Sequence, residues 1–204
     1  MIYKAVFLDK DGTLVEDIPY NVDPDWIQLS AGALEALYLL RDLGYLLIVV
    51  TNQSGVARGL FKEQELRQVE KRLQGMISSA GISLTGFYYC PHHPDGKIRK
   101  YAVECFCRKP QPGLLYRAGL EHNLDLSASW LVGDILNDIE AGNRAGCRTV
   151  LIDNNHETEW RLTSLRQPTF TVKNLKEAAY IIANESLKRN VIYGEQEQRL
   201  TKYY

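Results

Sequence analysis

Two aspartates stand directly after an apolar segment near the beginning of the chain. Val6, Phe7 and Leu8 run into Asp9, and Asp11 follows two positions later. Alternate side chains of an extended chain point the same way, so both carboxylates can converge on one ligand where a strand ends. Such a pair can divide the work between a nucleophile that also binds a cation and an acid that carries a proton. An isolated Asp-x-Asp is more often a turn and a helix cap, so the rest of the chain must decide.

The composition limits the classes of protein that remain. The 204 residues, 45% of them hydrophobic, suffice for one domain with a substantial core and argue against two full domains. The net charge is −1 and the basic residues are spread along the chain, which argues against a nucleic-acid partner. Apolar runs are too short for a membrane span, and Lys4 and Asp9 interrupt any signal-peptide core. We therefore expect a cytoplasmic monomer with no membrane partner.

Strand-like and helix-like segments alternate along the chain. The expected strands are residues 3–8, 46–50, 86–89, 130–132 and 149–152, the expected helices are 31–43, 62–80, 112–122 and 135–145, and one more strand and helix are expected in 170–184. This alternation predicts an α/β fold, a Rossmann-like parallel sheet with helices on both faces and right-handed crossovers. Such sheets bind ligands at the carboxyl ends of their strands. We expect one domain over residues 1–184, while the polar tail 185–204 receives no role.

A cluster of small polar residues follows the expected second strand. Its members are Thr51, Asn52, Gln53, Ser54 and Gly55. Their hydroxyl, amide and backbone donors suit phosphate oxygens. A capped turn would have the same composition, so this motif alone is a weak indication of a site.

Two later motifs carry opposite charges. Arg108 offers a planar guanidinium with paired donors and Lys109 a compact, mobile ammonium, and both suit phosphate. A pair of solvent-exposed basic side chains with no role in a site is the simpler interpretation. Asp134 directly follows an expected strand, and Asp138 lies four residues further on. Asp134 can complete a magnesium site with Asp9, whereas Asp138 either caps the following helix or orients the ligands.

In this order the motifs resemble those of the haloacid dehalogenase (HAD) superfamily. That family has Asp-x-Asp, a Ser or Thr after the second strand, a lysine, and a Gly-Asp pair followed by another Asp. The match covers residues 3 to about 152. Dehalogenating members lack the second acid of the first motif, so the presence of Asp11 points to phosphate transfer. The resemblance implies a phosphatase of HAD-like fold with a minimal cap.

The resemblance also implies a role for each matched residue. Asp9 would attack phosphorus and form an aspartyl phosphate, and Asp11 would protonate the leaving alkoxide and then activate water. Thr51 would hold the equatorial oxygens, while Lys109 and Mg²⁺ offset the accumulated negative charge. The implied magnesium ligands are the side chains of Asp9 and Asp134 and the backbone carbonyl of Asp11.

Cysteine and histidine residues gather in one polar loop, within residues 88–110. The expected ligand set is Cys90, His92, Cys105 and Cys107. Three sulfurs and one imidazole match a closed, tetrahedral structural zinc site rather than a set of disulfides. His93 and Cys147 are possible substitutes as ligands. Four protein ligands leave no open position, so the zinc is expected to fold the loop and to hold the neighbouring basic pair in place.

The spacing of these ligands narrows the resemblance to the zinc-bearing, nearly capless HAD phosphatases, which act on heptose bisphosphates or on histidinol phosphate. The twelve-residue spacer between His92 and Cys105 is similar to that of the heptose branch. It implies hydrolysis of the C7 phosphate of D-glycero-D-manno-heptose 1,7-bisphosphate. Histidinol phosphate, or a broader set of small phosphate esters, is the alternative. A zinc-organised binding module, the non-enzymatic alternative, would not need Asp11, Lys109 and Asp134 together.

Contacts to the rest of the substrate are expected from the edges of the site. The candidates are Asp17, Tyr20, Asn52, Gln53, Ser54 and Arg108. Many heptose enzymes carry a lysine after the last motif, where this chain has Ile135. An apolar side chain cannot donate to a second phosphate, so we expect a weaker preference between the two anomers of the bisphosphate.

Overall fold

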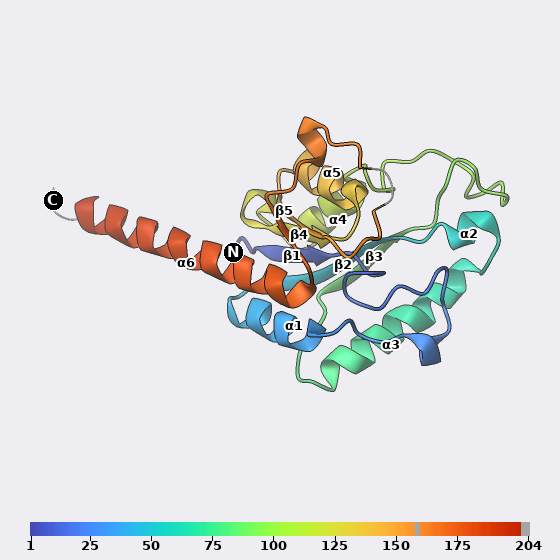
Figure 1. Cartoon of the computed structure of the whole chain (residues 1–204), viewed down its shortest axis with the longest axis horizontal. Helices are drawn as coiled ribbons and strands as arrows, with labels where there is room; N and C mark the ends of the chain where they lie inside the picture. Colours follow the sequence, from blue (N-terminus) through green and yellow to red (C-terminus); the bar gives the residue numbers. More distant parts are fainter. Residues whose placement is uncertain (158–159, 201–204) are drawn as a thin grey trace.

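The described residues, 1–157 and 160–200 of a computed structural model, contain one six-stranded sheet (Figure 1). Its order is β3-β2-β1-β4-β5-β6, and every adjacent pair is parallel. The strands are β1 (Ala5–Leu8), β2 (Leu46–Asn52), β3 (Gly86–Cys90), β4 (Trp130–Gly133), β5 (Arg148–Ile152) and β6 (Phe170–Val172). The predicted α/β fold and its parallel sheet are thus confirmed.

Helices cover both faces of the sheet (Figure 1). They are α1 (Ala33–Asp42), α2 (Gly55–Arg58), α3 (Leu66–Ser78), α4 (Gly113–Glu121), α5 (Leu136–Ala145) and α6 (Leu175–Leu200). Alternate residues of β1 serve the two faces: Val6 and Leu8 pack in a core with α1, α3 and α6, whereas Ala5 and Phe7 pack with α4 and α5. Burial on both faces explains why the sequence of β1 is continuously apolar.

The strand order places the reversal of the chain at β1. The chain builds β2 and β3 on one side of β1 and then returns to place β4 on the other side. Ligands bind open α/β sheets in the crevice at such a switch point, outside the carboxyl ends of the strands. The residues that follow β1 and β4 therefore lie where chemistry is expected.

Helices differ from the sequence-based expectation in three places. The short helix α2 was not expected, and a 3₁₀ turn (Glu63–Glu65) precedes α3, so that helix begins later than predicted. Helix α6 continues past residue 184, so the expected domain boundary falls inside it and its carboxyl half extends away from the sheet (Figure 1). Residues 184–193 contain neither proline nor glycine, and a buried hydrogen bond of 2.8 Å joins Ser186 to Tyr45. Among the described helices none is both long and apolar enough to cross a membrane.

Candidate active site

Three buried carboxylates meet at the ends of β1 and β4. Asp9 follows β1 and Asp134 follows β4, and the Asp9 N–H donates to the Val132 carbonyl at 2.9 Å, which keeps the two strand ends in register. Asp138 joins them from the first turn of α5, and one oxygen of each carboxylate lies within 4.8 Å of the others. Their exposed fractions are 8%, 5% and 0% for Asp9, Asp134 and Asp138.

Lys109 neutralises part of this charge. Its Nζ lies 2.5 Å from Asp9 Oδ1 and 2.6 Å from Asp138 Oδ1, and it donates to the Val50 carbonyl at 2.9 Å. The side chain is fully buried. Burial alone would lower the pKa of Lys109, but the carboxylates of Asp138 and Asp9 outweigh it and raise that pKa, so the ammonium stays charged. The second acid of the last motif therefore contacts Lys109 and also caps α5, because its other oxygen accepts the backbone N–H of Ile135.

The remaining negative charge suits a hard cation. Burial raises the pKa of Asp9 well above its usual range, and burial together with Asp138 raises the pKa of Asp134 to about 6. Three carboxylates share one buried ammonium, and oxygen ligands of this kind are those that Mg²⁺ prefers. Asp138 has one oxygen on Lys109 and accepts the Ile135 N–H with the other at 3.3 Å. Asp9 and Asp134 are thus the side chains best placed to hold magnesium.

Asp11 lies beside this cluster and is partly exposed. Gln53 Nε2 donates to Asp11 Oδ2 at 3.0 Å and to Thr51 Oγ1 at 2.9 Å, so it links the first two motifs. The ammonium of the buried Lys10 contacts the other Asp11 oxygen. The structure brings Asp11 and Thr51 to the same strand ends as Asp9, as the sequence predicts.

Asn52 fixes the backbone of the lysine motif. Its Nδ2 donates to the Lys109 carbonyl and its Oδ1 accepts the Lys109 N–H, both at 3.0 Å. These two bonds join the end of β2 to the loop that precedes α4. The side-chain amide of Asn52, which was predicted to contact substrate, therefore makes its hydrogen bonds to the backbone of Lys109.

A small cavity of about 260 Å³ opens beside Asp11. Most of the predicted substrate contacts line it: Asp17, Tyr20, Asn52, Gln53 and Ser54. Arg108 is not among its lining residues, and its guanidinium donates to the His92 carbonyl at 3.3 Å. Ile135 is half-buried at the start of α5, next to Asp134.

The loop after β5 reaches the site and was missed by sequence reasoning. Asn154 Nδ2 donates to the Gly12 carbonyl at 2.8 Å, and His156 Nδ1 lies 2.6 Å from Asp134 Oδ2. Glu157 accepts the Leu136 N–H at 2.6 Å. The signal was available, because polar residues directly follow a buried strand here, as they do at the three predicted motifs after β1, β2 and β4.

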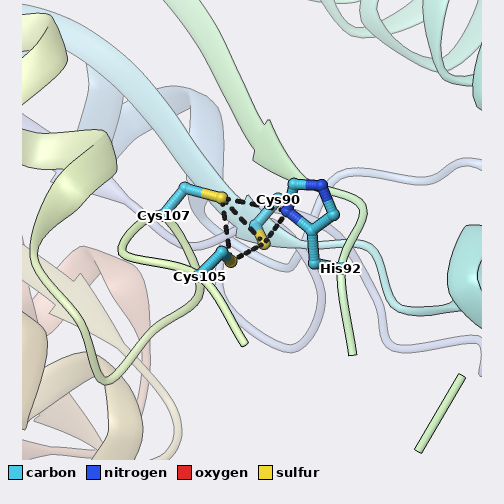
Figure 2. Close-up of side chains that lie close together, drawn as sticks. All are labelled: Cys90, His92, Cys105 and Cys107. Carbon is cyan, nitrogen blue, oxygen red and sulfur yellow. Dashed lines mark hydrogen bonds between the residues drawn. The ribbon is translucent and has the colours of Figure 1, made fainter. Parts of the chain in front are cut away.

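The cysteine and histidine side chains of the second site converge between β3 and α4 (Figure 2). Cys90 Sγ lies 3.5 Å from Cys105 Sγ and 3.2 Å from Cys107 Sγ. His92 Nδ1 lies 3.3 Å from Cys107 Sγ, and all four ligand atoms lie within 4.8 Å of one another. Contacts from the other cysteines lower the pKa of Cys107 to about 5, which favours a thiolate. Three soft sulfurs and one nitrogen at this spacing fit a tetrahedral zinc ion.

The two possible substitute ligands lie elsewhere. His93 Nε2 contacts Arg58 at 3.2 Å, and His93 Nδ1 accepts the Asp95 N–H at 3.1 Å. Cys147 is buried in the core beneath α4 and α5. Neither belongs to the cluster of ligand atoms found among the described residues.

Comparisons with known proteins agree with this geometry. A family model described as HAD-hydrolase-like matches residues 106–178. The chain is 41% identical over 182 residues to a D-glycero-beta-D-manno-heptose-1,7-bisphosphate 7-phosphatase of Pasteurella multocida, which covers 85% of this chain and 98% of the relative. It is 43% identical over 148 residues to a relative of the same name from Photorhabdus laumondii. This alignment covers 72% of this chain and 79% of the relative.

A solved structure shows that the similarity to these relatives also holds for the fold. The D,D-heptose 1,7-bisphosphate phosphatase of B. bronchiseptica, complexed with magnesium and phosphate, superposes with a TM-score of 0.76 at 30% identity and covers 89% of this chain and 99% of its own. The chain thus belongs to the HAD-like hydrolases and, within them, to the family of these heptose bisphosphate phosphatases. It is a phosphoric monoester hydrolase by that membership.

Proposed function

We propose that this chain is a magnesium-dependent phosphatase that removes the C7 phosphate of D-glycero-β-D-manno-heptose 1,7-bisphosphate. The observation that carries the proposal is the buried arrangement of Asp9, Asp134 and Lys109 at the switch point of the sheet. The relatives, which are named as phosphatases of the β-anomer of heptose 1,7-bisphosphate, supply the sugar and the anomer. Membership of the family alone would leave open whether the machinery is intact, and these three residues support an active enzyme.

Asp9 is the proposed nucleophile. Its carboxylate attacks the phosphorus of the C7 phosphate, the bond between phosphorus and the C7 oxygen breaks, and an aspartyl phosphate forms. Lys109, 2.5 Å from Asp9, favours the ionised carboxylate and stabilises negative charge on the transferred oxygens. The Thr51 hydroxyl and the backbone N–H groups that follow it provide further donors to those oxygens.

Asp11 is the proposed proton carrier. It donates a proton to the departing C7 alkoxide, and the carboxylate that results accepts a proton from water as that water attacks the aspartyl phosphate. Phosphate is released, and both aspartates return to their starting states. The hydrogen bond from Gln53 orients the Asp11 carboxyl toward the cavity.

The cation site and the zinc loop complete the proposal. Asp9, Asp134 and the backbone carbonyl of Asp11 would hold Mg²⁺, which supplies charge neutralisation at the phosphoryl oxygens when bound. A zinc ion on Cys90, His92, Cys105 and Cys107 is proposed to be structural. Because Cys107 immediately precedes Arg108 and Lys109, an ordered loop positions both basic residues. We further propose that the enzyme acts as a cytoplasmic monomer and that Arg108, Asp17 and Tyr20 recognise the rest of the sugar.

A panel of phosphate esters tests the substrate. We expect the highest kcat/KM for the β-anomer of heptose 1,7-bisphosphate, lower values for the α-anomer and for heptose 7-phosphate, and the lowest for an aryl phosphate. Histidinol phosphate is the informative competitor, because the related zinc-bearing branch uses it. A higher kcat/KM for histidinol phosphate than for both bisphosphate anomers would contradict the heptose assignment while leaving a phosphatase.

A further inference from the structure

The loop after β5 contacts two of the four motifs and the helix that follows the fourth. Asn154 holds the Gly12 carbonyl at 2.8 Å, and Glu157 accepts the Leu136 N–H at the start of α5 at 2.6 Å. Between these two attachments lies His156, whose Nδ1 is 2.6 Å from Asp134 Oδ2. The loop is thus anchored on both sides of the histidine.

The chemistry of the contact assigns the proton. A carboxylate oxygen only accepts, so Nδ1 of His156 carries the hydrogen and donates it to Asp134 Oδ2. This bond fixes the rotation of the carboxylate and leaves Asp134 Oδ1 for a cation. The side chain of Asp134 is 6% exposed and that of His156 is 38% exposed, so the bond joins a buried carboxylate to a histidine at the surface.

The close approach depends on Gly12. Its φ is +73°, and a Cβ at this position would lie 2.0 Å from Asp134 Oδ2 and 2.4 Å from His156 Nδ1. The backbone after the first motif therefore leaves room for the pair formed by Asp134 and His156. Groups that hydrogen-bond a ligating side chain set its orientation, and their loss typically weakens metal binding about 10- to 100-fold.

We propose that His156 is a positioning residue of the magnesium site, which orients the Asp134 carboxylate through Oδ2 so that Oδ1 faces the cation. The inference rests on the magnesium site of the proposed function but not on the identity of the sugar. It places a fifth segment of the chain, the loop after β5, in the working site.

Calorimetric titration of metal-free protein with MgCl₂ tests the inference without any substrate. We expect His156→Ala to raise the Kd for Mg²⁺ about 10- to 100-fold. His156→Asn retains a donor close to the position of Nδ1 and should restore most of the affinity, whereas His156→Leu, of similar bulk and without a donor, should not. His122→Ala, on the far end of α4, is the matched control and should bind as the wild type does.

A second readout separates positioning from stability. In turnover of an aryl phosphate, His156→Ala should need more Mg²⁺ for half-maximal rate but keep its kcat at saturating Mg²⁺ within about threefold of wild type, with an unchanged melting temperature. If the alanine variant melts early, the Asn and Leu variants decide by their difference in Kd. Equal Kd values for wild type and the donor-free variants overturn the inference alone, whereas wild-type protein that binds no Mg²⁺ overturns the magnesium site together with it.

Discussion

Two separate effects favour glycine at position 12, the backbone conformation and the lack of space for a Cβ. Its left-handed φ strains any L side chain, and a Cβ would also strike Asp134. Gly146, the C-cap of α5 with φ of +80°, has no atom within 4 Å of such a Cβ and isolates the first effect. Gly146→Ala should cost about 1–2 kcal/mol of unfolding free energy and leave activity intact. Gly12→Ala should lose phosphatase activity as well, and equal activities of the two variants would contradict the close packing at residue 12.

Asp9 and Asp11 are each predicted to be indispensable, for different reasons. Asp9→Asn is nearly isosteric but cannot form the acyl phosphate, and Asp11→Asn cannot move the proton. We expect both variants to fall below about one hundredth of the wild-type kcat with unchanged circular dichroism. Asp42→Asn, on the exposed end of α1, is the matched control and should keep full activity. Retention of more than about a hundredth of the wild-type rate by Asp9→Asn would refute the assignment of Asp9 as the nucleophile.

Magnesium binding should depend on pH through Asp134. Its pKa is raised to about 6 in the metal-free protein, because burial and Asp138 disfavour the charged form. Protons therefore compete with Mg²⁺ below this pH, and the raised pKa of Asp9 acts in the same direction. Titrations of metal-free protein should show an affinity that falls about tenfold per pH unit below pH 6 and more slowly above it. The same Kd at pH 7.5 and pH 5 would show that no buried carboxyl releases a proton to solvent when Mg²⁺ binds.

The site residues that could be predicted from the sequence are those that lie in a recognisable motif. Asp9, Asp11, Thr51, Lys109 and Asp134 were predicted to converge because each follows a buried strand or lies in a family motif, and the structure brings them together. The partnership between His156 and Asp134 was not predicted. It depends on a loop conformation that neither periodicity nor composition encodes.

At the scale of elements, the loop that carries the proposed zinc ligands is expected to depend on the metal. It runs from β3 to α4 with little regular structure, so a zinc ion on its four ligands would supply much of its order. Cys105→Ala should remove zinc and lower the melting temperature before it alters the chemistry. Cys147→Ala removes a buried thiol from the core and should retain one zinc per chain. Metal analysis with thermal melting checks both, and a zinc-free Cys105→Ala protein of unchanged melting temperature would contradict a structural site.

The strands were easier to predict than the helix ends. A strand buried on both faces is a short apolar run between polar residues, and the runs of the four inner strands β1, β2, β4 and β5 were found. The edge strands β3 and β6, which are less buried, were expected as well. Helix α2 spans only Gly55–Arg58, too short to show a periodic pattern. Helix α6 was predicted only to residue 184 because the sequence beyond it becomes polar, yet residues 184–193 contain neither proline nor glycine, and polar residues of this kind continue a helix once it has begun.

At the scale of the whole molecule, the order of the strands decides where the site lies. Parallel alternation predicted a sheet, but local sequence does not say that β4 pairs with β1 rather than with β3. The right-handed crossover rule and the positions of the motifs at strand ends made a single site the expectation. The structure adds that this site is at the reversal of the chain, where Asp9 and Asp134 come from adjacent strands.

The central claim is that the chain removes the C7 phosphate of the bisphosphate with Mg²⁺ and Asp9. Phosphorus NMR of β-heptose 1,7-bisphosphate during turnover tests it most directly, because the C1 and C7 phosphates have separate resonances. We expect loss of the C7 resonance, growth of inorganic phosphate and retention of the C1 resonance, with no change in the absence of Mg²⁺ or with Asp9→Asn. Loss of the C1 phosphate, or loss of the C7 phosphate at an unchanged rate in the Asp9→Asn variant, would contradict it.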